Sequence, residues 1–173
     1  GQVPAMDLFD PFLNDVEYLY WYHILNTGIK MPVSTGSDWF VSSANRVYSQ
    51  TDGRFAYATW LDGLRNGRTF ITNGPALFLM VAGKEPGETI EVEKGTRLPI
   101  HVNWYSHHPV ERVEIVLNGK IVERRDYPEG MNAGYLEIDL VAQSDGWLGA
   151  RLGSASRDSF NQPIWAHTSP VYL

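Results

Sequence analysis

The feature that most constrains the fold is a two-residue alternation of apolar and polar side chains through the second half of the chain. Successive side chains of a β-strand point to opposite faces, so this spacing predicts strands that are buried on one side. The positions predicted to point inward are Leu98, Ile100, Val102, Trp104, Val113, Ile115, Leu117, Leu136, Ile138 and Leu140. The acidic residues between them, Glu114, Glu137 and Asp139, are then predicted to face solvent.

A tight turn separates two of these runs. Asn118-Gly119 is the dipeptide that favours a type I′ hairpin, because both central residues of that turn need a positive φ. Together the runs predict about seven short strands in about 100 residues, which is the usual size of an immunoglobulin-like sandwich. We therefore expect residues 76–173 to form an antiparallel β-sandwich.

The first part of the chain has a helical spacing instead. Asp10-Pro11 is predicted to start a helix that Gly28 ends, because a capping carboxylate followed by proline is typical of helix starts. The expected apolar face of this helix consists of Phe12, Val16, Leu19, His23 and Leu25.

A second helix is predicted from about Asp52 to Asn66-Gly67, followed by a strand from Arg68 to Thr72. The Asn73-Gly74-Pro75 segment is the candidate boundary between two domains, 1–75 and 76–173. The predicted fold class is thus α+β, mainly β, with the helical part first and the sandwich second.

Composition excludes several functions. The net charge of −6 disfavours nucleic acid as a partner, because a phosphate backbone requires clustered Lys and Arg. No apolar run is long enough for a membrane span. The absence of cysteine excludes disulfides and cysteine metal sites. It leaves the compartment open, with a lean towards a secreted or periplasmic bacterial protein.

The histidines do not form a recognisable metal motif. None of the five occurs as His-x-His or His-Glu-x-x-His. His107 and His108 are expected in a solvated turn, and His101 is expected on the solvent side of its strand. His23 is expected to be partly buried on the helix face, and His167 to bond the backbone near the C-terminus.

Asp38 is the candidate residue for metal chemistry. It follows Gly36-Ser37 at the end of an extended segment, and carboxylates at the carboxyl ends of barrel strands commonly bind metals. The alternative is a structural role as a turn or helix cap, which the motif alone favours. The chain has neither a Gly-x-Ser-x-Gly elbow nor a phosphate-binding Gly-Lys-Ser/Thr loop, so it contains no complete catalytic site.

Several blocks in order resemble the late part of a PHP-type metallohydrolase domain, closest to the carbaryl-hydrolase-like (CehA/McbA-like) branch. The blocks are residues 20–28, Pro32, residues 35–38, residues 60–75 and residues 166–172. The resemblance covers nearly the whole chain, and the order of the blocks carries it.

This resemblance implies a distorted barrel that holds two or three divalent metals, zinc or manganese, and hydrolyses an ester, amide, carbamate or phosphoester. Asp38 matches the acid of a late Gly-Ser-Asp-x-His-type motif, while Phe40 stands where the family has histidine. The early ligand motifs are missing. We therefore expect a C-terminal fragment, whose Gly1 is not a natural start, with an N-terminal metallohydrolase domain in cis. The fragment alone is expected to bind no metal tightly.

Two other readings stay open. The chain could be a non-catalytic binding module for a carbohydrate or a protein, with tyrosines such as Tyr105, Tyr127 and Tyr135 exposed for stacking. A row of aromatic side chains on one flat sheet face would favour that reading. Alternatively, the parent protein has lost its metal, as Phe40 would suggest.

Overall fold

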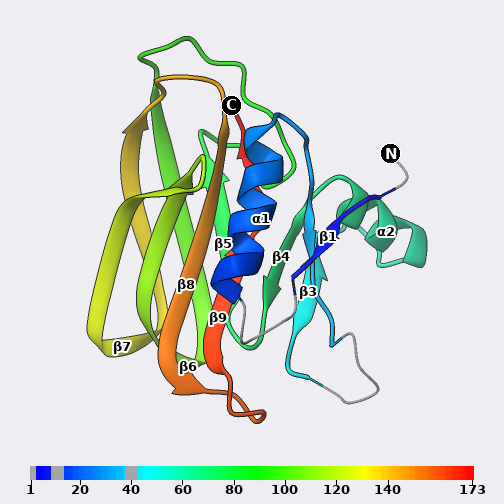
Figure 1. The fold of residues 1–173 in the computed structure, drawn as a ribbon, viewed down its shortest axis with the longest axis vertical. Helices are drawn as coiled ribbons and strands as arrows, with labels where there is room; N and C mark the ends of the chain where they lie inside the picture. Colours follow the sequence, from blue (N-terminus) through cyan, green and yellow to red (C-terminus); the bar gives the residue numbers. More distant parts are fainter. Residues whose placement is uncertain (1–2, 9–13, 38–42) are drawn as a thin grey trace.

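The computed structural model describes residues 3–8, 14–37 and 43–173, which form a mostly antiparallel β-structure with two short helices (Figure 1). The elements in chain order are β1 (Met6–Asp7), α1 (Asn14–Asn26), β2 (Val33–Ser34), β3 (Arg46–Ser49), α2 (Tyr57–Arg65), β4 (Thr69–Thr72), β5 (Ala76–Val81), β6 (Arg97–Leu117), β7 (Lys120–Val141), β8 (Trp147–Arg157), β9 (Pro163–Thr168) and β10 (Val171–Tyr172). Within the described part, no helix is both long and apolar enough to cross a membrane.

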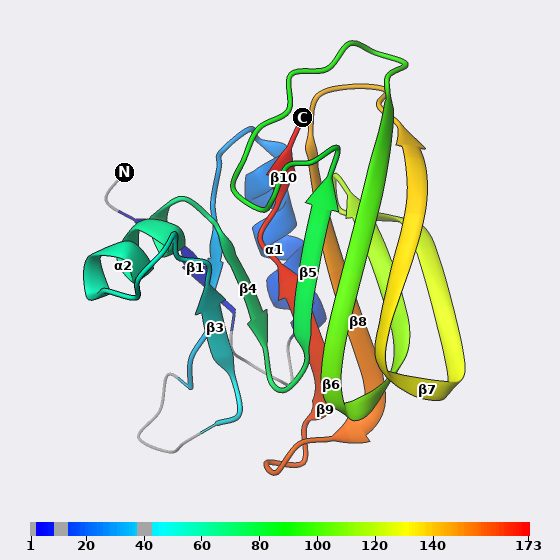
Figure 2. The same cartoon turned by 180° about the vertical axis from the view of Figure 1, so that it is seen from behind.

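Two long strands build both layers of the sandwich (Figure 2). The first half of β6 lies between β5 and the second half of β7, and we call this layer the small sheet. The second half of β6 lies between β8 and the first half of β7, in the order β3-β4-β9-β8-β6, and we call this layer the large sheet. Strands that pass from one sheet to another do so at bends and bulges.

The bend in β6 corrects one prediction. The register shifts between Tyr105 and Val110, so the strand changes layer there. His107 and His108 were predicted to lie in a turn between strands, but they lie within β6 at this bend. Residues 76–173 consequently contain the strands β5 to β10 rather than about seven short strands. The reason is that two of these strands are long, since β6 spans 21 residues and β7 spans 22 residues.

The predicted sandwich core is confirmed. Leu98, Ile100, Val102, Trp104, Val113, Ile115 and Leu136 are buried in one apolar cluster, and Leu117, Ile138 and Leu140 pack against it. The predicted hairpin is also confirmed, with φ of 50° at Asn118 and 81° at Gly119. Glu137 and Asp139 are exposed, as predicted.

The prediction for Glu114 is wrong, because its side chain is only 2% exposed. Period-two alternation assumes that one face of a strand meets water. Here α1 covers the outer face of the large sheet (Figure 1), so this part of β6 is buried on both faces.

Of the face predicted for α1, Leu25 is buried as expected, but the other described members are not. Val16 and Leu19 are 43% and 65% exposed, and His23 is exposed rather than partly buried. The residues that pack on the sheet are Tyr18, Trp21, Tyr22 and Leu25. These four residues have the i, i+3, i+4, i+7 spacing of a second apolar stripe on the same helix. This stripe contains aromatic rings that bury more surface than the side chains of Val16 and Leu19. Asp10, Pro11 and Phe12 lie outside the described residues.

The second helix begins at Tyr57 rather than near Asp52, whose carboxylate accepts two hydrogen bonds from Arg68 at 2.5 and 2.6 Å. Gly67 ends it with a φ of 70°, as predicted. The strand predicted next is β4, which pairs with β3 and with β9. The large sheet therefore joins strands from 1–75 to strands from 76–173, and the division into those two domains stays a prediction.

Gly134 shows how tightly the small sheet is packed. It pairs with Trp104, whose indole ring lies over it and is fully buried. A Cβ at position 134 would come within 2.6 Å of Cη2 of that ring. The site therefore has no room for a larger side chain.

Replacing Gly134 by alanine is expected to destabilise the protein by about 1–3 kcal/mol, because the ring of Trp104 has to leave its rotamer. In an ordinary strand the same change would gain about 0.5–1 kcal/mol. Urea unfolding followed by tryptophan fluorescence measures the difference, with Ala133→Ser on the exposed side of the same strand as the control. A Gly134→Ala protein as stable as the parent would contradict this packing.

Candidate binding groove and the predicted metal ligand

Asp38, the predicted metal ligand, and Phe40 lie outside the described residues, but the segment before them is well anchored. β1 and β2 pair in parallel, and the Thr35 hydroxyl donates to the carbonyl of Leu8 just beyond β1. The side-chain amide of Asn45 donates to the carbonyl of Gly36 at 3.3 Å. The backbone that leads to Asp38 is thus held at the carboxyl end of a parallel strand pair.

The blocks that carry the family resemblance meet beneath this segment. The Ser169 hydroxyl accepts from the Val33 amide at 3.0 Å and lies 2.7 Å from the Thr69 hydroxyl, which donates to the Val33 carbonyl. These groups are buried and far apart in sequence. The shared role of these residues is therefore to fix β2 on the large sheet.

His167 is the most buried histidine, and its prediction as a backbone-bonded residue is confirmed. Its Nδ1 donates to the Thr168 carbonyl at 2.7 Å, so Nε2 is the acceptor for the Tyr22 hydroxyl at 2.5 Å. Complete burial, aided by the nearby charge of Arg151, lowers the pKa of His167 to about 3. The ring is therefore neutral at pH 7 and bridges the sheet to α1. Sequence reasoning missed Tyr22, which the aromatic stripe of the helix could have indicated.

The described histidines and acids do not come together as a metal site. Across residues 3–8, 14–37 and 43–173, no three His, Asp or Glu side chains are placed to hold one ion. His101 lies on the small sheet and its Nδ1 is 3.1 Å from Glu137. His23 and His107 are exposed on other parts of the surface.

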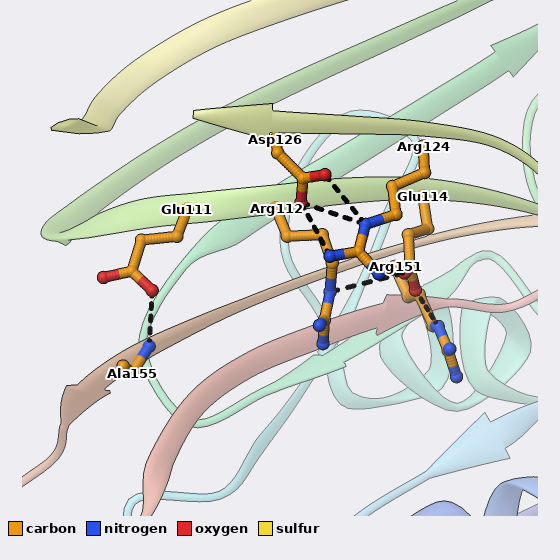
Figure 3. Close-up of polar contacts among 7 residues, drawn as sticks. All are labelled: Glu111, Arg112, Glu114, Arg124, Asp126, Arg151 and Ala155. Atoms are coloured by element: carbon orange, nitrogen blue, oxygen red, sulfur yellow. Dashed lines mark hydrogen bonds and ion pairs between the residues drawn. The ribbon is translucent and has the colours of Figure 1, made fainter. Parts of the chain in front are cut away.

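Glu114 is the buried centre of an ion-pair network that links β6, β7 and β8 and whose outer members are exposed (Figure 3). Its carboxylate accepts from Arg151 at 2.6 Å and lies 3.3 Å from Arg112 and 3.9 Å from Arg124. Arg124 also binds Asp126 at 2.9 Å. The network ties β6, β7 and β8 together, with three guanidinium groups against the two carboxylates of Glu114 and Asp126.

A row of aromatic rings runs across the four strands β3, β4, β5 and β6. Tyr48 stacks on Phe70 with centroids 4.9 Å apart, Phe70 meets Phe78 edge-on at 5.7 Å, and Phe78 meets Tyr105 edge-on at 6.5 Å. Tyr48, Phe78 and Tyr105 are 53%, 49% and 62% exposed. The row thus crosses from the large sheet, on β3 and β4, to the small sheet, on β5 and β6. Exposed rings gathered in this way are typical of a binding surface.

A groove of about 570 Å³ runs along these rings, within the range of about 300–1,000 Å³ that is usual for ligand sites. Most of its wall is apolar, from β4, β5 and Pro86. Polar groups converge on it from several elements: Ser49, Gln50, Arg68, Glu85, His101, Asn103 and Thr168.

Two of the three tyrosines expected to be exposed for stacking are exposed. Tyr105 lies in the aromatic row, and Tyr135 is 71% exposed on β7 of the same small sheet. Tyr127 instead packs on Trp104 with centroids 5.4 Å apart, and burial raises the pKa of its hydroxyl. Tyr127 is therefore partly buried against the core rather than displayed with the other two rings.

Comparison with known proteins adds little to this geometry. No family model matches the chain, and no curated protein matches it. Among solved structures, the crystal structure of CHIR-AB1 is similar over 57% of this chain and 94% of that chain, at 20% identity and a TM-score of 0.32. That score is too low to support an argument about this protein.

Proposed function

We propose that the chain is the C-terminal portion of a metal-dependent hydrolase, and that the β-sandwich is its non-catalytic accessory part. The observation that carries this is the parallel pair β1–β2, which leads at its carboxyl end to Gly36-Ser37 and, in the sequence, to Asp38. Ligands commonly follow the carboxyl ends of parallel strands. The family-like blocks packed beneath β2 support the same reading.

Asp38 in this proposal supplies a carboxylate oxygen to zinc or manganese in the longer protein. A hydrolytic site needs about three protein ligands and an open position for water, whose pKa the metal lowers to about 7. The remaining ligands would come from an N-terminal metallohydrolase domain in cis. The substrate would be an ester, amide, carbamate or phosphoester.

Asp38→Asn in the longer protein tests the proposal. An amide can still cap a turn but is a poor ligand for a hard cation, so kcat should fall by orders of magnitude and the metal content should drop. If Asp38 is a structural cap, the variant should lose about 1 kcal/mol of stability and keep its turnover. Asp62→Asn, on the exposed side of α2, is the matched control.

The same proposal predicts that this chain alone binds no divalent metal tightly. Titration calorimetry with zinc and with manganese should show no stoichiometric site, because one carboxylate leaves most coordination positions to water. A stoichiometric, tight site in the chain alone would show that the metal centre does not need an N-terminal domain.

The second candidate function is a binding module, and the aromatic row along the groove favours it. Exposed rings on neighbouring strands, with polar groups converging beside them, are able to hold a ligand without any catalytic residue. The two candidates are compatible, because an accessory domain of a hydrolase commonly binds rather than reacts.

A further inference from the structure

A second pocket lies on the face of the large sheet that α1 covers. It has a volume of about 330 Å³ and lies between the flank of α1 and the β6–β7 hairpin. Leu19 and Tyr22 of α1 form one part of its wall, and Gly119 and Ile121 of the hairpin form another. None of its lining residues lines the aromatic groove, so the two sites are separate.

Arg151 of β8 is the charged residue of this pocket. Its Nε donates to the Glu114 carboxylate at 2.6 Å (Figure 3), whereas its terminal nitrogens, Nη1 and Nη2, donate no hydrogen bond within the described part of the chain. Neither terminal nitrogen is sealed in the core, because the indole nitrogen of Trp165 is the only buried side-chain atom without a partner among the described residues. Arg151 therefore has two free donors at the pocket.

The ion-pair network around Arg151 has an excess of positive charge. Arg112, Arg124 and Arg151 supply three guanidinium groups, whereas Glu114 and Asp126 supply two carboxylates. No Asp or Glu is among the described residues that line the pocket, so none cancels the remaining unit of charge there. A ligand with a single negative charge would therefore balance the network.

The rest of the pocket favours a flat apolar group. The rings of Tyr18 and Tyr22 stack with centroids 5.9 Å apart and planes at 9°. The hydroxyl of Tyr22 is bonded to His167, so this residue offers its ring to the pocket. Leu19 and Ile121 are 65% and 47% exposed, so a bound ring would cover apolar surface that now meets water.

We propose that this pocket binds a small aromatic carboxylate, whose two oxygens accept hydrogen bonds from Nη1 and Nη2 of Arg151. A guanidinium is planar and matches a carboxylate with two parallel hydrogen bonds. The volume is near the lower end of the range for ligand sites, which suits one ring rather than a polymer. A phosphate dianion fits less well, because the excess positive charge is a single unit. This inference goes beyond the proposed hydrolase and does not depend on it.

Titration of the whole chain with sodium benzoate, followed by NMR of its N–H groups, is the first test. We expect saturable shifts of the Gly119 and Ile121 amides and of the Arg151 Nε–H, with a Kd on the order of 1 mM for so small a ligand. Benzamide has the same shape without the charge and should bind about tenfold more weakly or worse. Absence of saturable shifts at these groups, at benzoate concentrations well above this Kd, would overturn the proposal.

Two variants locate the carboxylate. Arg151→Lys keeps the positive charge but removes the fork of two donors, so benzoate should bind about tenfold more weakly. Because Arg151 also holds Glu114, Leu19→Glu is the second variant, which leaves the ion-pair network intact. It places a carboxylate in the pocket wall at an exposed position of α1 and should weaken benzoate about fivefold through like-charge repulsion.

Tyr20→Glu is the control for Leu19→Glu. It adds the same charge to the same helix at a residue that is 66% exposed and does not line the pocket. At an ionic strength of about 0.15 M, screening should keep the Kd for benzoate within about twofold of the parent value. Equal weakening by the two glutamates, or unchanged binding in both Arg151→Lys and Leu19→Glu, would refute binding at this pocket.

Inorganic phosphate distinguishes a site for an aromatic acid from a general anion site. Phosphate should bind more weakly than benzoate, because it gains nothing from the apolar wall. Equal affinity, with shifts at the same amides, would overturn the assignment of an aromatic carboxylate. Benzoate shifts confined to the aromatic groove, at Phe78 and Tyr105, would also overturn it while leaving the binding-module candidate in place.

Discussion

Glu114→Gln is expected to destabilise the protein by about 3–5 kcal/mol, because it leaves a buried guanidinium without its carboxylate. The side chain of Arg151 is only 22% exposed and depends on Glu114 at 2.6 Å. Arg112 and Arg124 are 45% and 50% exposed and can turn to water, so most of the cost arises at Arg151. Thermal unfolding should show a midpoint lower by roughly 6–20 °C.

Glu137→Gln is the matched control for this prediction. Glu137 is a strand carboxylate with a single exposed partner, His101, and its loss should cost at most about 1 kcal/mol. The double variant Glu114→Leu with Arg151→Met should recover much of the lost stability, since apolar replacement of a buried pair is often neutral. Equal midpoints for Glu114→Gln and Glu137→Gln would show that Glu114 is not buried among the arginines.

Acid is expected to destabilise the fold through His167. Burial lowers its pKa to about 3, against about 6.5 in the unfolded chain. Above pH 6.5 neither state binds the proton, so the stability is fully present. As the pH falls below 6.5 the unfolded chain takes up the proton and the folded one does not, so stability decreases by up to about 1.4 kcal/mol per pH unit. Over the whole window the loss is on the order of 5 kcal/mol.

Urea unfolding at pH values between 7 and 5 measures this slope, in a range where few carboxylates titrate. His167→Gln should be less stable at pH 7 but should lose the slope, because glutamine does not ionise. Tyr22→Phe removes the hydrogen bond to His167 and should cost about 1 kcal/mol while keeping the slope. Parallel pH profiles for the parent and His167→Gln would contradict the neutral, buried state of the ring.

The sandwich core was predictable because period-two alternation requires nothing beyond a strand with one buried face. Leu98 to Trp104 and Leu136 to Leu140 fulfil that condition. Glu114 does not, because α1 covers the outer face of β6, and no local pattern shows that a helix distant in sequence packs there. The wrong helix face has a related cause: Val16 and Leu19 are apolar, but the rings of Trp21 and Tyr22 bury more surface.

The candidate site was less predictable than the core. The groove depends on the pairing of β5 with β6 alone and on the position of β4, so Phe70 and Phe78 become neighbours only through tertiary structure. Tyr105, Tyr127 and Tyr135 were proposed for ligand stacking only because they are tyrosines. In the structure Tyr127 packs against Trp104 instead. Asp38 lies outside the described residues, and its role as a ligand stays a prediction.

The place of β9 in the large sheet has a consequence for synthesis of the chain on the ribosome. β9 lies between β4 and β8, and the Thr72 hydroxyl donates to the carbonyl of Trp165, 93 residues later. At about 5–20 residues per second, β4 waits roughly 5–20 s for its partner to be made. During that interval the nascent chain exposes the unpaired edge of β4 together with Ile71, which is buried in the finished fold, so chaperone demand should be greatest just before the last strands emerge.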